Sequence, residues 1–340
     1  MGILSASYGV PLLNDVLCRT PSVLLYHGVS RTSRCGEVDA ARFETQVLFL
    51  KRHFAFIHPD QVGTRRAFGT RIQVLLTFDD GFRNNAEVVA PILRRNSVPA
   101  IFFISSRHVT PGKYLFSAYL TMLLRNFKAN GFNVRGEFMD MRPNHRRETL
   151  RRLTRWLSQL KPYPTALYRV LDEELPRLEE FVTPEEIRDE CAGMTEDQVH
   201  EVASDPLFRV GAHTVDHPRL EECERDEALR QITENKLWLE RVSGQACDTV
   251  AYPYGNYKRE TIELCRLAGL HRGYAVLQKF ISDPDWEIPR IGIYSPSVDV
   301  LGFKVVWARA LALDYWPRSL TSVISNKERN CPLPASMGIA

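Results

Sequence analysis

Short apolar runs alternate with amphipathic segments along the first third of the chain. Residues 22–26, 72–78 and 100–104 are predominantly apolar runs that predict buried strands. Between them, apolar residues recur at helical spacing over 42–53 and 83–95. An order of strand, helix, strand, helix, strand favours parallel pairing with the helices outside the sheet.

This rhythm stops over about 112–193 and then resumes. The interrupting segment shows helical signals and no clear strand, which predicts a helical insertion over one end of the sheet. Its arginines are Arg146, Arg147, Arg151, Arg152 and Arg155. Acidic clusters follow them, so we expect solvated helix faces with intrahelical ion pairs, with a polyanion site as the alternative.

Four more strand candidates follow the insertion, at 208–211, 248–252, 273–276 and 288–293. The resulting organisation is a 1–20 extension, a 21–300 α/β domain of seven strands that includes the insertion, and a 301–340 helical tail. Because the tail is amphipathic and aromatic, we expect it to pack on the domain, with peripheral contact to the inner membrane face as the alternative.

Composition narrows the classes of partner and compartment. The 340 residues carry 44 Lys and Arg against 41 Asp and Glu, so we expect no nucleic-acid partner. The 7 cysteines have no metal-site or disulfide spacing, which favours a reducing compartment. No secretory signal pattern and no apolar run of transmembrane length is present. These features together predict a cytoplasmic protein.

The strand at 72–78 runs directly into Asp79, Asp80 and Gly81. In α/β proteins, catalytic and ligand-binding residues lie mostly at the carboxyl ends of the strands. Adjacent side chains on an extended segment point to opposite faces, so the two carboxylates can take different roles. A solvated turn after a strand would have the same sequence, and the motif alone leaves both interpretations open.

Two histidines four residues apart, His213 and His217, follow the strand at 208–211. Imidazoles at this spacing can converge on one ion, although a surface pair has the same spacing. Parallel strands would bring the Asp79–Asp80 pair to the same end of the sheet. Two histidines and a carboxylate leave positions open for water and substrate, which is typical of a catalytic metal site.

These motifs resemble the polysaccharide deacetylases of the NodB-homology type, carbohydrate esterase family four. The resemblance rests on Thr77-Phe78-Asp79-Asp80-Gly81 and His213-Thr214-Val215-Asp216-His217, and on Ala251-Tyr252-Pro253-Tyr254-Gly255 as a third motif. It implies a distorted (β/α)7 barrel and metal-dependent hydrolysis of an N-acetyl group on a sugar.

Carried over residue by residue, the resemblance implies a role for each motif position. Asp80, His213 and His217 would bind a divalent metal, with Zn²⁺ expected and Ni²⁺ or Co²⁺ as alternatives. Asp79 would be the general base for a metal-activated water. Pro253 and Tyr254 would border the substrate, with a backbone N–H near Tyr254 stabilising the oxyanion.

Two positions depart from the family pattern. The third motif usually begins with an arginine that pairs with the base, and this chain has Ala251 there. Arg290 is a candidate substitute, unless it is a strand-end surface residue. The usual C-terminal histidine is also missing, whereas Tyr26-His27-Gly28 ends the first strand, as in exopolysaccharide deacetylases. His27 is therefore the expected general acid, with a structural strand-capping histidine as the alternative, and the other histidines, His108 among them, are expected to be ordinary.

The expected substrate is an N-acetylated glycan or a lipid- or nucleotide-linked sugar precursor. Two other classes stay open at this stage. A non-haem Fe(II) oxygenase also uses two histidines and one carboxylate. A non-catalytic carbohydrate-binding descendant would explain the missing motif arginine.

Overall fold

The computed structural model describes residues 21–31, 38–63, 71–280 and 283–311. Seven parallel strands form a closed ring, as the family resemblance implies. Around the ring these are β1 (Ser22–Tyr26), β10 (Ile288–Gly292), β9 (Arg272–Ala275), β8 (Thr249–Ala251), β7 (Phe208–Ala212), β4 (Ala100–Ile104) and β3 (Gln73–Phe78). Strand β1 closes the ring because it pairs with both β10 and β3. An eighth, two-residue strand that the pattern did not predict, β2 (Ala55–Phe56), pairs with the start of β3.

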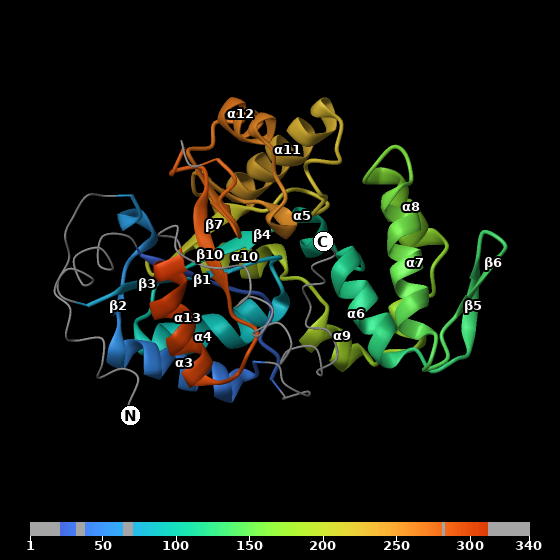
Figure 1. Ribbon diagram of the computed structural model, residues 1–340, viewed down its shortest axis with the longest axis horizontal. Helices are drawn as coiled ribbons and strands as arrows, with labels where there is room; N and C mark the ends of the chain where they lie inside the picture. Colours follow the sequence, from blue (N-terminus) through green and yellow to red (C-terminus); the bar gives the residue numbers. More distant parts are fainter. Residues whose placement is uncertain (1–20, 32–37, 64–70, 281–282, 312–340) are drawn as a thin grey trace.

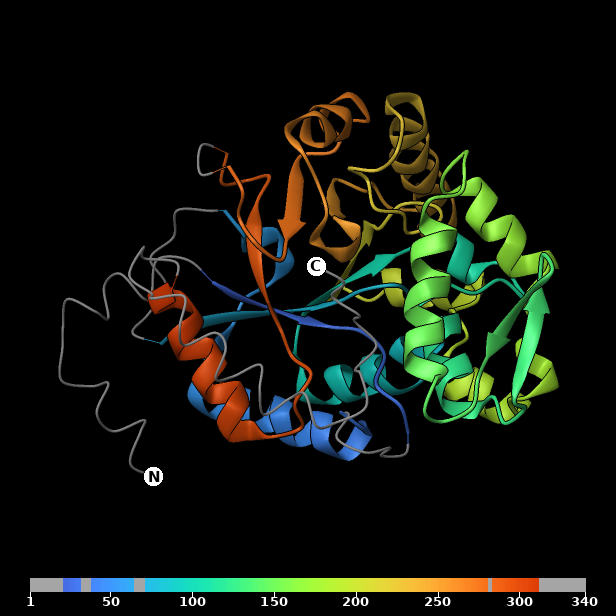
Figure 2. The ribbon, with the colours of Figure 1, turned by 45° about the vertical axis from the view of Figure 1, so that its right-hand side comes forward.

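Helices surround this barrel, with the inner strands visible between them in two views (Figures 1 and 2). They are α3 (Ala40–His53), α4 (Ala90–Asn96), α5 (Ser106–Val109), α10 (Glu196–Ala203), α11 (Arg225–Ser243), α12 (Arg259–Leu267) and α13 (Val298–Leu311). A π-helical turn, Asn85–Val89, precedes α4. Helix α10 begins at the capping box that the sequence predicts, with the Thr195 side chain accepting from the backbone N–H of Gln198.

Two separate apolar clusters follow from the alternation of side chains along each strand. The larger lies between strands and helices. The smaller includes Leu75, Phe103 and Tyr274 and fills the inside of the barrel. Alternate residues of an extended strand point to the same side, so Thr77 and Asp79 face the inside of the barrel as Leu75 does. Asp79 therefore lies at the carboxyl end of the barrel and points inward.

The insertion stands beside the barrel as its own layer (Figures 1 and 2). It holds α6 (Phe116–Asn126), α7 (Arg146–Ser158), α8 (Thr165–Glu173), α9 (Pro184–Glu190) and an antiparallel hairpin of β5 (Gly131–Val134) and β6 (Glu137–Asp140). The hairpin corrects the expectation of a strand-free insertion. Its turn residues, Arg135 and Gly136, both have positive φ, which is the two-residue turn that matches strand twist.

Ion pairs join the insertion to the barrel. The Arg107 guanidinium lies 2.5 Å from the Asp172 carboxylate and packs over the Tyr168 ring at 3.9 Å from its centroid. Lys113, at the start of the insertion, reaches the same carboxylate at 2.8 Å. Acidic residues of the insertion also pair with cations outside their own helix, so the expected intrahelical ion pairs account for only part of its charge pairing. Among the described residues, α7 has one such pair, Arg151 with Glu148 at 3.5 Å.

Helix α13 packs on the barrel through Leu301 and Val305, which are buried. The helix begins at Val298, slightly before the expected domain boundary at 301. The expectations for residues 1–20 and for the tail beyond 311 lie outside the described residues. None of the described helices combines the length and apolar character that crossing a bilayer requires.

Gly81 follows β3 at a φ of +78°, and a Cβ built there would lie 2.7 Å from the Cγ2 atom of Ile104. Gly136 has a similar φ of +80° with nothing within 4 Å. We expect Gly136→Ala to lower the free energy of unfolding by about 1 kcal/mol, from backbone strain alone. Gly81→Ala should lower it by about 3 kcal/mol, because the contact with Ile104 adds overpacking. Urea unfolding measures both, and equal losses would contradict this explanation.

Candidate metal centre and active site

The predicted site residues come from loops that follow different strands at the carboxyl end of the barrel. Asp79 and Asp80 follow β3, and His213 and His217 follow β7. Three of the residues in these loops, Asp80, Thr214 and His217, have positive φ although none is glycine. Asp80, at a φ of 77°, is not extended, so its side chain does not simply point opposite to Asp79. Backbone strain of this kind is typical of functional sites.

Asp80, His213 and His217 form one buried cluster whose ligand atoms all lie within 4.8 Å of one another. The Asp80 Oδ1 atom lies 3.4 Å from His213 Nε2 and 3.2 Å from His217 Nε2. The two imidazole rings lie edge to face with their centroids 4.7 Å apart. The three residues that the sequence predicts as ligands are therefore brought together in a geometry that could hold a metal ion.

Hydrogen bonding around the cluster is consistent with a metal. The Nδ1 atom of His213 lies 2.8 Å from the carbonyl oxygen of Ala251, an acceptor, so this nitrogen carries a proton. In a neutral ring, the Nε2 atom then presents a lone pair toward the carboxylate of Asp80. His213 Nε2 and Asp80 Oδ1 are both buried and have no hydrogen-bond partner. A cation between them would satisfy both lone pairs, and two imidazoles with one carboxylate are a donor set suited to Zn²⁺.

The charges within the cluster oppose the effect of burial. Burial raises the pKa of Asp80, but the imidazoles of His217 and His213 outweigh it and hold this pKa well below its usual range. Burial lowers the pKa of His217 to about 3. Burial also lowers the pKa of His213, but the carboxylates of Asp79 and Asp80 raise it overall. An ionised carboxylate beside a neutral His217 is the state in which these groups bind a metal.

Asp79 is held by Arg290 inside the barrel. The guanidinium donates through Nη1 to Asp79 Oδ1 at 2.6 Å and through Nη2 to Oδ2 at 2.9 Å. Both side chains are buried, at 4% and 1% exposure. Burial raises the pKa of Asp79, but Arg290 and then His213 outweigh it and keep this pKa below its ordinary value. Arg290 thus makes the bidentate contact to Asp79, and it is not a surface arginine.

The order of strands explains this pairing. Strand β1 separates β3 from β10, and Asp79 donates its backbone N–H to the Tyr26 carbonyl of β1. Arg290 lies in register with Val23 on the other side of β1. Ala251, where the family motif has arginine, points into the barrel on β8, and its carbonyl oxygen orients His213.

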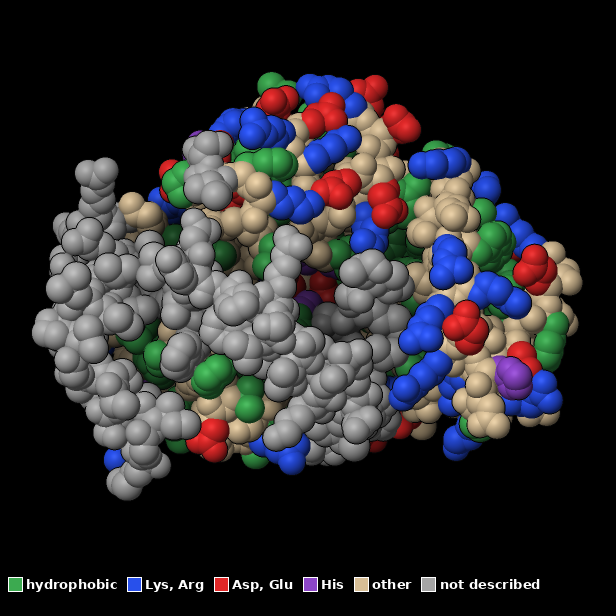
Figure 3. Space-filling model, in the orientation of Figure 1, with side chains coloured by type: hydrophobic (Ala, Val, Ile, Leu, Met, Phe, Trp, Pro, Cys, Tyr) green, Lys and Arg blue, Asp and Glu red, His purple; other side chains and the backbone are tan. Residues whose placement is uncertain are grey.

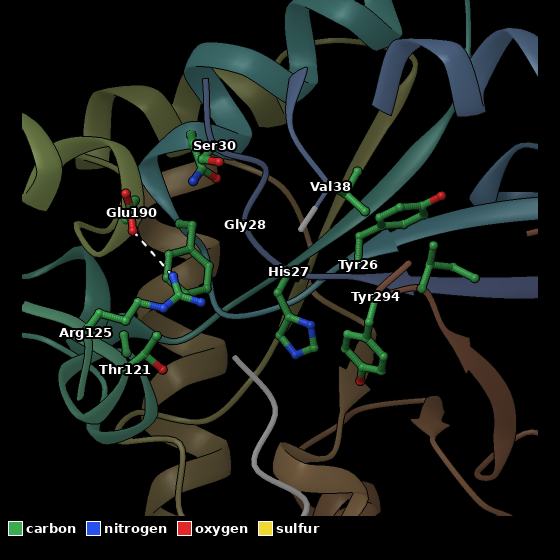
Figure 4. A pocket seen from close by; sticks show the side chains of 13 residues that line it. Tyr26, His27, Gly28, Ser30, Val38, Thr121, Arg125, Glu190 and Tyr294 are labelled. Carbon is green, nitrogen blue, oxygen red and sulfur yellow. Dashed lines mark hydrogen bonds and ion pairs between the residues drawn. The ribbon is translucent and has the colours of Figure 1, made fainter. Parts of the chain in front are cut away.

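His27 follows β1 and lines a pocket together with Tyr294 (Figure 4). Its ring stacks near that of Tyr294, with centroids 6.2 Å apart. The far wall of the pocket belongs to the insertion, where Arg125 lies 3.5 Å from Glu190. His27 therefore borders a cavity that the barrel and the insertion build together.

Pro253 and Tyr254 follow β8 in a short 3₁₀ turn, with Tyr254 at a φ of 57°. The Tyr254 ring packs edge to face on His217 at 4.5 Å, and the Arg219 guanidinium lies 5.1 Å from its centroid. Tyr254 and Arg219 line a second pocket whose other walls are α6, α7 and α8. Pro253 is buried beneath this turn.

His108, expected to be ordinary, contacts the metal-ligand loop directly. Its Nδ1 lies 3.1 Å from the carbonyl oxygen of Asp80, and its Nε2 lies 2.7 Å from that of Cys191. Cys191 is where the insertion returns to the barrel, so this buried imidazole joins the two. A second missed residue, Asn235 of α11, accepts from the backbone N–H of His213. Neither residue belongs to a local motif, and only the packing identifies them.

Comparison with known families agrees with this geometry. A sequence profile of the family described as polysaccharide deacetylase matches residues 69–135 and 158–273, which is more than half of the chain. This chain belongs to the polysaccharide deacetylase family. As a polysaccharide deacetylase, it is a hydrolase that removes N-acetyl groups from carbohydrate. The gap between the matched segments falls within the insertion. No match to a curated protein was found.

Solved structures of low sequence identity share the fold of this polysaccharide deacetylase. The Streptococcus pyogenes deacetylase PplD in complex with acetate has 16% identity and a TM-score of 0.52, covering 83% of this chain and 96% of its own. IcaB from Ammonifex degensii has 17% identity and a TM-score of 0.51, covering 86% of this chain and 97% of its own. The putative polysaccharide deacetylase BA0330 from Bacillus anthracis has 13% identity and a TM-score of 0.53, covering 84% of this chain and 68% of its own.

Removing only one partner of the Asp79–Arg290 pair should be more harmful than removing both. Arg290→Met leaves a buried carboxylate unpaired, and we expect the free energy of unfolding to fall by about 3–5 kcal/mol. Adding Asp79→Asn should recover about 2–3 kcal/mol of that loss. Urea unfolding of the two single variants and the double variant, all in chelator, measures the coupling. Simple additivity of the two substitutions would show that the pair is not coupled.

Proposed function

We propose that this protein hydrolyses the N-acetyl group of an acetamido sugar, in a polysaccharide or a glycan precursor, with a divalent metal held by Asp80, His213 and His217. The buried convergence of these three ligands beside the Asp79–Arg290 pair is the observation that carries the proposal. Zn²⁺ is the metal we propose, because the donor set suits it, and Ni²⁺ or Co²⁺ would fit the same donors. When bound, the ion would supply Lewis-acid chemistry, lowering the pKa of water and polarising the acetyl carbonyl.

Asp79 is the general base in this proposal. Its carboxylate accepts a proton as the oxygen of water bonds to the acetyl carbon. Arg290 keeps the carboxylate ionised and fixes its orientation through two parallel hydrogen bonds. Asp79 Oδ2 also lies 3.8 Å from His213 Nε2, so the base is adjacent to the ligand cluster. With Arg290 serving this function, Ala251 is no longer a reason to favour a non-catalytic descendant.

His27 is the general acid in this proposal. The amide C–N bond breaks only if the departing nitrogen gains a proton, because a free amide anion is too basic to leave. His27 borders the pocket on the barrel side, opposite the wall that the insertion forms, which suits a group that meets the sugar portion of the substrate. The products are acetate and the free amino sugar.

The oxyanion is assigned to a backbone N–H in the turn of Pro253 and Tyr254. This turn faces His217 through the Tyr254 ring, at 4.5 Å. Hydrogen-bond donors aimed at developing negative charge lower the barrier to acyl transfer.

Membership in a deacetylase family leaves the non-haem iron oxygenase without support. The cytoplasmic location stays a proposal; buried, reduced Cys191, Cys223, Cys247 and Cys265 are in keeping with it.

Acetate release tests the function directly. We expect the Zn²⁺-loaded protein to release acetate from at least one member of a panel of N-acetylated glycans and sugar precursors. A chelator should abolish release, and adding Zn²⁺, Ni²⁺ or Co²⁺ back one at a time should restore it and rank the metals. No release across the panel by a protein with bound metal would reject the proposal.

Two substitutions separate metal binding from catalysis. Asp80→Asn should reduce bound metal, as measured by elemental analysis of purified protein. Asp79→Asn should keep its metal but lower kcat by about 10²–10⁴-fold, because the base is lost. Metal loss in Asp79→Asn, or unchanged turnover by it, would contradict the division of roles.

The role of His27 can be tested with two leaving groups. His27→Gln should lower kcat for an N-acetyl sugar by about 10²-fold or more, because the amine must be protonated as it leaves. Hydrolysis of 4-nitrophenyl acetate should change little, because nitrophenolate departs without a proton. His53→Gln, an exposed histidine on α3, is the matched control. An equal loss with both substrates would show that His27 is not the acid.

A further inference from the structure

The arginines of α7 divide into two groups with different surroundings. Arg146 donates to the carbonyl oxygens of Met141 and Leu124, and Arg152 lies near that of Phe138. Arg146 thus joins α7 to α6 and to the end of the hairpin, and Arg152 contacts the hairpin strand β6. The other three, Arg147, Arg151 and Arg155, are exposed, as Arg152 is, but follow one another at intervals of four residues. We call these three the arginine stripe.

The arginine stripe is nearly free of neutralising carboxylates. Arg151 has one weak pair, with Glu148 at 3.5 Å, and that carboxylate is 74% exposed. Among the described residues, Arg147 and Arg155 have no carboxylate partner. Residues 142–161 contain seven Lys or Arg and one acidic residue. An uncompensated row of this kind creates a positive field along the helix.

The stripe is continuous with the second pocket of the site. Residues three and four apart are neighbours on a helix, so Arg151 adjoins Thr154 and Arg155 adjoins Ser158. Thr154 and Ser158 line the pocket that Tyr254 closes on the barrel side. The pocket also holds the Arg219 cation, 5.1 Å from the Tyr254 ring. Figure 3 shows Lys and Arg side chains along the insertion, beside a hollow in which acidic and His side chains are visible.

We propose that the arginine stripe binds an anionic glycan chain and guides it through the pocket at Tyr254 to the metal cluster, which makes a uronate-bearing N-acetylated polysaccharide the substrate class. The inference rests on the proposed de-N-acetylation. Three arginines spaced by four residues extend over about 12 Å of helix, at 1.5 Å per residue. That length matches a row of charges on an extended chain better than one compact diphosphate.

The test compares substrates that differ only in charge. Hyaluronan and heparosan oligosaccharides combine N-acetylglucosamine with a glucuronate carboxylate, and reducing each carboxyl group to an alcohol gives the neutral counterpart. We expect the anionic form to have a KM about tenfold lower at low salt, with similar kcat, and this preference should shrink as salt rises. Equal KM values for the two forms would overturn the proposal.

The variant Arg147→Gln/Arg151→Gln/Arg155→Gln should raise KM for the anionic form about tenfold and leave the neutral form within about twofold. The control Arg52→Gln/Arg95→Gln/Arg241→Gln removes the same charge from the exposed ends of α3, α4 and α11, at the opposite end of the barrel, and should leave the preference intact. Arg147→Lys/Arg151→Lys/Arg155→Lys should restore most of the affinity. A comparable effect of the control variant would overturn the proposal, since net charge alone would then explain the result.

Direct binding keeps the inference separate from the proposed function. Calorimetric titration of the same oligosaccharides should show binding that requires the stripe even where no acetate is released; that outcome would reject the activity and support the anionic-glycan site. Two further probes distinguish other anions. If the triple Arg→Gln variant of the stripe lost binding to phosphatidylglycerol vesicles but kept its affinity for the uronate glycans, the proposal would be overturned in favour of a membrane. If the same variant lost turnover of UDP-N-acetylglucosamine but kept its affinity for the uronate glycans, a nucleotide carrier would be favoured instead.

Discussion

The site depends on the position of β1 between β3 and β10. Hydrogen bonds from β1 to both neighbours close the barrel and set Asp79 and Arg290 on either side of one strand. The same strand ends at His27, so the proposed base, its cation and the proposed acid share one structural support. A buried guanidinium and a buried carboxylate are each unfavourable alone, and each makes the other tolerable at the carboxyl end of the barrel.

Charge balance explains the composition of the cluster. Two adjacent carboxylates would repel each other in a buried site, yet each has its own partner: Arg290 holds Asp79, while His213 and His217 face Asp80. The Ala251 carbonyl fixes the His213 tautomer, so in a neutral ring the lone pair of His213 Nε2 faces the Asp80 carboxylate. A cation bound between these two atoms would satisfy both. The arrangement is therefore organised for an ion that family membership also implies.

The insertion is part of the site as well as an addition to the barrel. It supplies walls to the pocket beside His27 and to the pocket beside Tyr254. His108 and the return of the chain at Cys191 tie it to the loop that carries Asp80. Since the barrel is shared by deacetylases of low sequence identity, the insertion and its arginine stripe are where substrate preference specific to this protein can arise.

Local patterns in the sequence were sufficient for the order of most strands and helices and for the Asp79–Asp80 and His213–His217 pairs, and the family resemblance of these motifs then implied the barrel and Asp80, His213 and His217 as ligands. Apolar periodicity and motif spacing act over a few residues, so they can be recognised without coordinates. Tertiary structure alone decided that Arg290 reaches Asp79 across 211 residues, that His108 contacts the Asp80 loop, and that acidic residues of the insertion pair with Arg107 and Lys113 instead of α7. Each depends on which elements pack side by side, and no local pattern encodes that.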